Sequence, residues 1–226
     1  MIIWTPQPKV IEGKKDTYDA LTSKILDIYQ TDEKLIEESS TDPQIQQIAK
    51  QLSEITISPY QTLNIPVIGK DQSASEYFLQ KFKEIYKKEY NSEAVIEKVS
   101  GHHAIGMAQE SDGISVYRPA DGEIYEFDAS FMVDCLPWIG AGILLETVFN
   151  KAPDQAVDYG NRIKSIADSL IMEHKIEYLL NHRNKLPDNT KEGYKMIHFL
   201  LSASSWLLFW GSHGHEINTK SYNRYG

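Results

Sequence analysis

The sequence predicts an α+β fold in which an antiparallel sheet of about four strands, within residues 94–128, is flanked by N-terminal and C-terminal helices. Apolar residues recur at helical spacing in the first part of the chain, over 1–93. Short alternating runs separated by turn residues fill 94–128, and helical spacing returns over 129–226. Because both helical parts need the sheet to bury their apolar stripes, we expect one domain over 1–226.

The N-terminal part contains three predicted helices. The first, over 16–29, places Tyr18, Leu21 and Ile25 on one stripe. The second begins at Asp42-Pro43, because an aspartate caps free backbone amides and proline suits the first helical position. A third follows after residue 73.

The central part is predicted to form a β-meander. The runs 94–99, 102–108, 114–119 and 123–128 are short, and turn residues such as Asp112-Gly113 and Asp121-Gly122 separate the last three. A tight hairpin would place His103 opposite Pro119 on the neighbouring strand. Opposed positions of a sheet are close enough for side-chain contact, so we expect His103 to lie near the turn that contains Asp121.

The C-terminal part contains a long amphipathic helix and a second helix, over 196–210, that is apolar nearly all round. A helix of that kind is either buried or in a membrane. Crossing a bilayer takes about 20 apolar residues, so the shorter run favours burial, and membrane contact through 196–210 stays the open alternative. The tail from His213 is polar, and we expect it to be loosely held.

Composition narrows the function classes. The chain has 23 Lys and Arg against 32 Asp and Glu, a net charge of −9, which argues against an electrostatic nucleic-acid binder. Cys135 is the single cysteine, so no internal disulfide or cysteine-based zinc site is expected, and a reducing, cytoplasmic location fits. No phosphate-binding or dinucleotide-binding motif is present, and we expect no cofactor and no metal. Residues 101–135 hold seven acidic side chains against Arg118 alone, which favours a basic protein as partner.

Two short segments carry a family resemblance. The run from Gly101 to Gly106 (GHHAIG) and the run from Val116 to Phe127 (VYRPADGEIYEF) together resemble the His–Asp half of the YopT-type papain-like cysteine peptidases. The resemblance implies a papain-like core and a bacterial effector role in virulence, and a protein translocated without a cleavable signal. It also implies that His103 is the catalytic imidazole and that Asp121 orients it.

Other residues depart from that family's pattern. Arg118 stands where the family has its aspartate, and a guanidinium disfavours a neighbouring imidazolium. No cysteine precedes His103, and Cys135 follows it in an apolar context. Two hypotheses result. In the first, the chain is a catalytically degenerate papain-like protein that binds a protein partner, with His102 and Arg118 as binding residues. In the second, it is an active acyl-transfer enzyme or hydrolase that uses His103 and Asp121 with a thiol, Cys135, or a hydroxyl as nucleophile.

Overall fold

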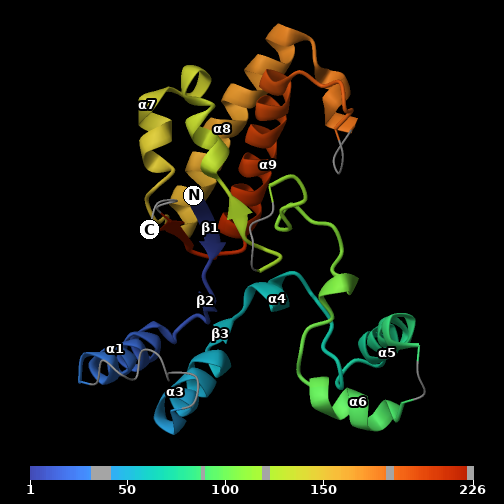
Figure 1. The fold of residues 1–226 in the computed structure, drawn as a ribbon. Coiled ribbons are helices and arrows are strands. Elements are labelled where there is room, and N and C mark those ends of the chain that lie inside the picture. Colours follow the sequence, from blue (N-terminus) through green and yellow to red (C-terminus); the bar gives the residue numbers. More distant parts are fainter. Residues whose placement is uncertain (32–41, 88–89, 119–122, 182–185, 223–226) are drawn as a thin grey trace. The chain divides into compact units, whose positions relative to one another are not determined.

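The computed structural model describes residues 1–226 except 32–41, 88–89, 119–122, 182–185 and 223–226 (Figure 1). Helices and antiparallel strands both occur, so the predicted α+β class is confirmed. The chain divides into two compact units, one of Met1–Gln7 with Tyr60–Gly226 and the other of Pro8–Pro59. That both units fold as one domain stays a prediction.

The described residues of the unit Pro8–Pro59 form two helices and a short antiparallel strand pair. Asp42 begins the second helix as predicted, because its carboxylate accepts backbone hydrogen bonds from Gln44 (2.8 Å) and Ile45 (2.9 Å). The helix then buries Ile45 and Ile48. The elements are β2 (Lys9–Val10), α1 (Lys15–Thr31), α3 (Pro43–Glu54) and β3 (Thr56–Ile57).

The sheet of the larger unit joins the two ends of the chain. Strand β1 (Ile2–Pro6) lies between β4 (Phe127–Asp128) and β5 (Ile217–Ser221), and both pairings are antiparallel. Trp4 of the central strand is opposite Phe127 on one side and Thr219 on the other. The sheet therefore depends on contacts between segments more than 100 residues apart in sequence.

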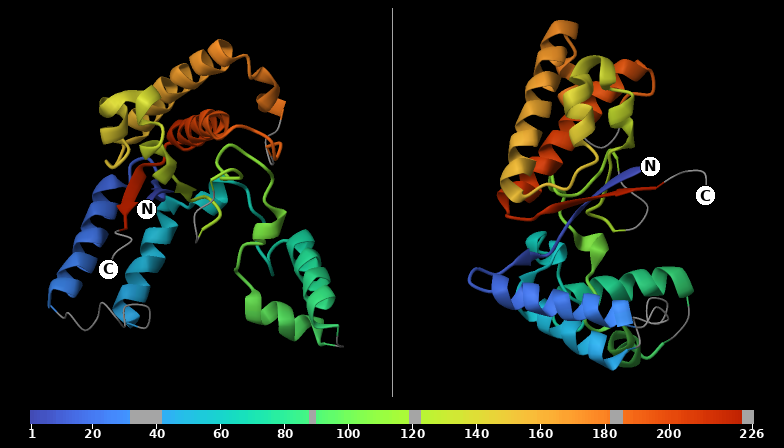
Figure 2. Two further views of the ribbon diagram at one scale, coloured as in Figure 1. Left: turned by 45° about the horizontal axis from the view of Figure 1, so that its top comes forward. Right: turned by 90° about the vertical axis from the view of Figure 1, so that its left-hand side faces the viewer.

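Helices α8 (Pro153–His174) and α9 (Glu192–Ser212) pack along each other, as both views in Figure 2 show. Glycines permit this close approach. A Cβ placed on Gly160 would lie 3.2 Å from the Cβ of Leu207, and one on Gly211 would lie 2.7 Å from the carbonyl oxygen of Pro153. The kinked helix α7 (Leu136–Glu146) completes this part of the unit, and its kink falls at Gly140, where φ is +72°.

Helix α9 is buried, as the length of its apolar run predicted. Trp206, Leu207 and Trp210 are fully buried in the core that also holds Trp4 of β1. Among the described residues, no helix combines the length and apolar character needed to cross a membrane.

A smaller apolar cluster forms around Ile68, Ala74 and Ala104, with Phe78 and Val99 packed against it. Asn91 begins one of its helices by accepting backbone hydrogen bonds from Glu93 and Ala94. The remaining elements are α4 (Pro59–Thr62), α5 (Gln72–Tyr86), α6 (Ser92–Val99), η1 (Ile105–Met107), η2 (Ser130–Val133) and η3 (Glu177–Asn181).

The predicted meander over 94–128 is wrong. Residues 94–99 lie in α6, because the Asn91 cap supplies a helix start that the short alternating pattern concealed. The 102–108 run gives a single bridge between His103 and Val67 and then the 3-10 helix η1. Residues 114–118 form no strand, and of the 123–128 run only Phe127–Asp128 forms one.

The tail was also predicted wrongly, because its beginning is fixed in the fold. His215 is fully buried, and β5 pairs along the whole of β1. A polar tail can be ordered when the central strand of a sheet offers it a full row of backbone hydrogen-bond partners.

Candidate functional site

The residues predicted to form a His–Asp pair are not joined by a ladder in the described chain. His103 lies at its bridge with Val67, where its Nδ1 is 3.1 Å from the carbonyl oxygen of Ile65 and its ring stacks on Tyr60 at 4.6 Å. Asp121 lies outside the described residues. His102 is exposed, with its Nδ1 3.1 Å from the carbonyl oxygen of Val99. The catalytic role of His103 and Asp121 therefore stays a prediction.

Arg118 is held by contacts within the fold. Its Nη2 lies 3.3 Å from the carboxylate of Asp128. The guanidinium carbon is 5.2 Å from the ring centre of Phe131 and 5.1 Å from that of Phe199. Because two aromatic rings and a carboxylate of the fold contact the guanidinium, the structure gives Arg118 a packing role, and its predicted binding role is untested.

Cys135 is fully buried at the start of α7, within the main apolar core. The pKa of its thiol is raised to about 12, chiefly by burial and to a smaller extent by Asp134, while Arg118 opposes the shift. A thiol nucleophile reacts as the thiolate. Cys135 therefore lacks both the access and the ionisation that the thiol hypothesis requires.

The thiol of Cys135 is expected to resist a disulfide reagent in the native protein at pH 8 and to react once the chain is unfolded, because the thiolate form and a path to solvent are both missing. A colorimetric assay with an aromatic disulfide, before and after addition of denaturant, measures this. The matched control is Cys135→Ala combined with Val133→Cys, since Val133 is exposed two residues earlier. Stoichiometric labelling of native wild-type protein at the control's rate would contradict the account.

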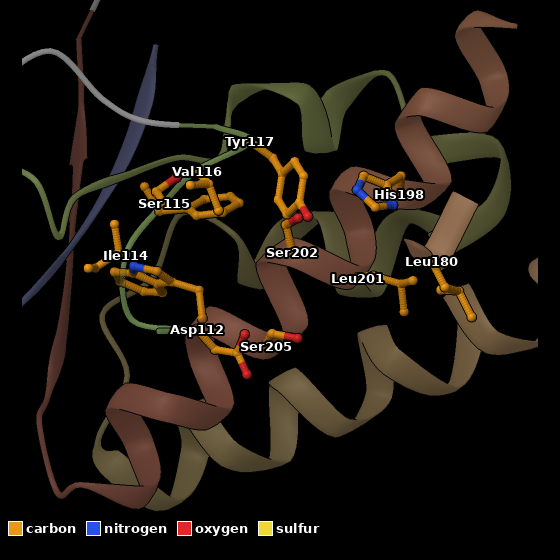
Figure 3. Close-up of a pocket in the computed structure, with 12 residues that line it drawn as sticks. Asp112, Ile114, Ser115, Val116, Tyr117, Leu180, His198, Leu201, Ser202 and Ser205 are labelled. Carbon is orange, nitrogen blue, oxygen red and sulfur yellow. The ribbon is translucent and has the colours of Figure 1, made fainter. Parts of the chain in front are cut away.

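A pocket of 190 Å³ lies beside α9 (Figure 3). One face of this otherwise apolar helix carries His198, Ser202 and Ser205, spaced four and three residues apart, so the helix turn places them in one row. The segment 112–117 supplies the opposing wall, as Figure 3 shows. This row was not among the sequence-based predictions, although three polar residues at helical spacing in a mostly apolar helix indicate a polar stripe on one of its faces.

The wall formed by 112–117 is anchored directly to α9. The indole of Trp210 donates a hydrogen bond to the carbonyl oxygen of Gly113 (3.2 Å). A Cβ on Gly113 would lie 2.4 Å from the ring of Phe209, so only glycine allows this approach. The ring of Tyr117 meets the buried ring of His198 edge to face at 4.5 Å. Contacts within the fold therefore hold this wall of the pocket in place.

The pocket combines an apolar surface with hydroxyl groups and a carboxylate. Ile114 and Leu201 contribute apolar side chains, Ser202 and Ser205 contribute hydroxyls, and Asp112 contributes a carboxylate. Among the described residues that line the pocket there is no lysine or arginine. Hydroxyl and carboxylate oxygens accept hydrogen bonds, so this arrangement suits an alkyl chain that ends in a positively charged donor.

A second, charged cavity of 400 Å³ lies near the start of α8 and contains a buried lysine. Lys151 donates hydrogen bonds to the carbonyl oxygens of Glu146 (2.7 Å) and Phe149 (2.8 Å), and its ammonium lies 4.6 Å from the ring centre of Tyr159. Arg162 pairs with the carboxylate of Glu146. Burial lowers the pKa of Lys151 to about 8, although Glu146 opposes this shift. The contacts of Lys151 with α7 give it a structural role.

The lowered pKa of Lys151 predicts a pH dependence of stability. Between pH 8 and 10.5 the unfolded chain holds a proton that the folded chain has released, so this group adds stability as pH rises through that window. We expect the free energy of unfolding of wild type, minus that of Lys151→Met, to rise by up to about 3 kcal/mol across it. Urea titrations at several pH values measure the difference, with Lys164→Met, at an exposed ion pair, as control. A difference that is flat with pH would contradict the expectation.

Fold and site together define an α+β protein with an open pocket on a buried helix. Comparisons with models of protein families, with curated proteins and with solved structures found no match. Among the described residues, no group of three or more His, Cys, Asp or Glu side chains is placed to hold a metal ion.

Proposed function

We propose that this chain is a protein-binding module and that the α9 pocket receives a lysine side chain of a basic partner. The observation that carries the proposal is the composition of the pocket, where the carboxylate of Asp112 lies with the hydroxyls of Ser202 and Ser205 beside apolar side chains. A lysine side chain has the matching structure, with four methylenes and a terminal ammonium that donates three hydrogen bonds.

Two physical effects would act on such a partner. The alkyl part of the lysine would bury apolar surface against Ile114 and Leu201, which is favourable at roughly 25 cal/mol per Å². The ammonium would gain charge-assisted hydrogen bonds from Asp112 and the serine hydroxyls. The net charge of −9 would speed the approach of a basic protein and make the association sensitive to salt.

The proposal keeps the partner-binding role of the first sequence-based hypothesis and assigns no reaction to Cys135. Support for leaving out thiol chemistry comes from the burial of that side chain and its raised pKa. The papain-like relationship, the effector role and translocation from a bacterium remain expectations from the resemblance alone.

The experiment is a titration of the protein with two matched peptides, acetyl-Ala-Ala-Lys-Ala-Ala-amide and the same peptide with norleucine in place of lysine. The norleucine peptide keeps an alkyl chain and loses the ammonium. We expect it to bind at least tenfold more weakly, because charge-assisted hydrogen bonds are lost. Chemical-shift titration by NMR measures both dissociation constants.

Variants then test whether the carboxylate of Asp112 is the recognising group. Asp112→Asn should weaken binding of the lysine peptide about tenfold, whereas Asp134→Asn, which removes an exposed carboxylate outside the pocket, should leave it unchanged. Ser205→Leu, which fills the pocket, should weaken both peptides. Equal binding of the two peptides, or equal losses in the two aspartate variants, would contradict the proposal.

A further inference from the structure

Helix α7 and the residues next to it leave an apolar surface exposed on the larger unit (Figure 1). Five of the fifteen large apolar side chains that are exposed in the described chain lie within residues 133–149, namely Val133, Leu136, Leu145, Val148 and Phe149. Single exposed apolar side chains are ordinary on a protein surface, whereas a group of them marks an interaction site. We call the exposed side chains of residues 133–149 the α7 face.

The C-terminal half of the α7 face follows the helix turn. Ala141, Leu145 and Val148 are all exposed and are spaced four and three residues apart, which places them on one side of a helix. The backbone amides of Val148 and Phe149 donate hydrogen bonds to the carbonyl oxygens of Leu145 and Glu146, so the turn continues past the end of α7. These side chains therefore form one continuous apolar strip.

The α7 face is nearly neutral, which restricts what can cover it. Asp134 is the only exposed charged residue within 133–149, because Glu146 is half-buried and its carboxylate pairs with Arg162 of α8. Residues 133–149 contain no lysine or arginine to attract the headgroups of an anionic membrane, and only Asp134 to attract a basic protein. The surface that covers this face must therefore be neutral and apolar as well.

A glycine at the centre of the face indicates that another backbone comes close. Gly142 lies inside α7 without a positive φ, and glycine at such a position destabilises a helix relative to alanine. The other described glycines that lack a positive φ, such as Gly160 and Gly211, have an atom of the fold within 4 Å of the place where a Cβ would lie. Gly142 has none, so no close approach within the fold explains this glycine.

We propose that the α7 face binds the α7 face of a second copy of this chain, in a symmetric dimer whose two helices cross at Gly142. Two helices approach closely only when both have small residues at the contact, and α7 has Gly140, Ala141 and Gly142 in the middle of its face. The α7 face is thus itself the neutral, apolar surface with a small-residue centre that it requires of a partner. A two-fold dimer brings identical patches together in this way. The proposal is independent of the α9 pocket and of the function proposed for it.

Sedimentation equilibrium of the full chain over a range of concentrations tests the dimer. We expect the mean mass to rise from the 25.8 kDa of one chain toward twice that value. The dissociation constant should be about 10 to 100 µM, because the face has fewer residues than the roughly 20 to 30 a side of a standard interface. A mass that stays at one chain up to about 500 µM would overturn the proposal. Binding of single chains to phosphatidylcholine vesicles in place of self-association would also overturn it, and would assign the face to a membrane.

Three substitutions locate the contact. Leu145→Glu places a charge on the face and should weaken self-association at least tenfold, whereas Met172→Glu, at a side chain of α8 that is 73% exposed, should leave it unchanged. Gly142→Ala should stabilise the single chain against heat and yet weaken self-association, because the added methyl group fits the open space of one chain and separates two helices. Equal effects of the two glutamate variants, or self-association unchanged by Gly142→Ala, would overturn the proposal. Circular dichroism checks that each variant is folded.

Discussion

Replacing Trp4 by alanine is expected to lower the free energy of unfolding by about 3 to 5 kcal/mol, a large part of the 5 to 15 kcal/mol that is roughly the stability of an ordinary protein. Trp4 is fully buried in the central strand and stacks on Phe127 and Trp206, with ring centres 5.7 and 6.1 Å away. Its indole N–H donates a hydrogen bond to the carbonyl oxygen of Thr147 (2.9 Å). One substitution thus opens a cavity and leaves a buried acceptor without its donor.

Two further variants are compared with Trp4→Ala. One separates the contribution of the ring from that of its N–H, and the other is a control at an exposed position. Trp4→Phe keeps an aromatic ring but loses the N–H, and should cost less than Trp4→Ala. Leu145→Ala removes a large apolar side chain that is 61% exposed, and should change stability by no more than about 0.5 kcal/mol. Urea unfolding followed by circular dichroism measures all three. A loss below about 1 kcal/mol for Trp4→Ala would mean that Trp4 is not at the centre of the core.

The second large effect is expected for His215→Leu, at about 2 to 5 kcal/mol. The side chain is fully buried. Its Nδ1 lies 2.7 Å from the carbonyl oxygen of Gln7 and therefore donates, so Nε2 accepts the hydroxyl hydrogen of Thr62 at 2.7 Å. Leucine fills a similar space but leaves both partners without their hydrogen bonds in a buried environment.

The matched control for His215→Leu is His213→Leu. His213 lies two residues earlier and is exposed, and its side-chain Nδ1 lies 2.7 Å from the carbonyl oxygen of Phe209. We expect a loss of no more than about 1 kcal/mol for this control. Thermal unfolding followed by circular dichroism compares the two variants. Equal shifts in melting temperature would mean that the tail is held as loosely as its polar sequence predicts.

The features predicted correctly from the sequence depend on local interactions. Asp42 and Pro43 predict a helix start because capping involves only the next few backbone amides. The length and apolar composition of the run 196–210 predict that this helix, α9, is buried. Phe127 was correctly placed in a strand. Such signals are complete within about 20 residues of chain.

The features that failed depend on pairing between distant segments. The sheet forms because β1 pairs with residues 127–128 and 217–221, and no short window of sequence contains that information. The alternating run at 94–99 fits a capped helix equally well. The α9 pocket could not be predicted because the sequence does not show that the segment 112–117, which was predicted to form a turn and a strand, faces Ser202 and Ser205 in the fold.

The most direct test of the central claim is the position of a bound lysine side chain, measured by intermolecular nuclear Overhauser effects between the ε-methylene protons of a lysine peptide and the methyl groups of the protein. The account predicts contacts from these protons to Ile114 and Leu201, which line the α9 pocket. Contacts confined instead to exposed methyl groups elsewhere, such as those of Leu145 and Val148 near the end of α7, would contradict it.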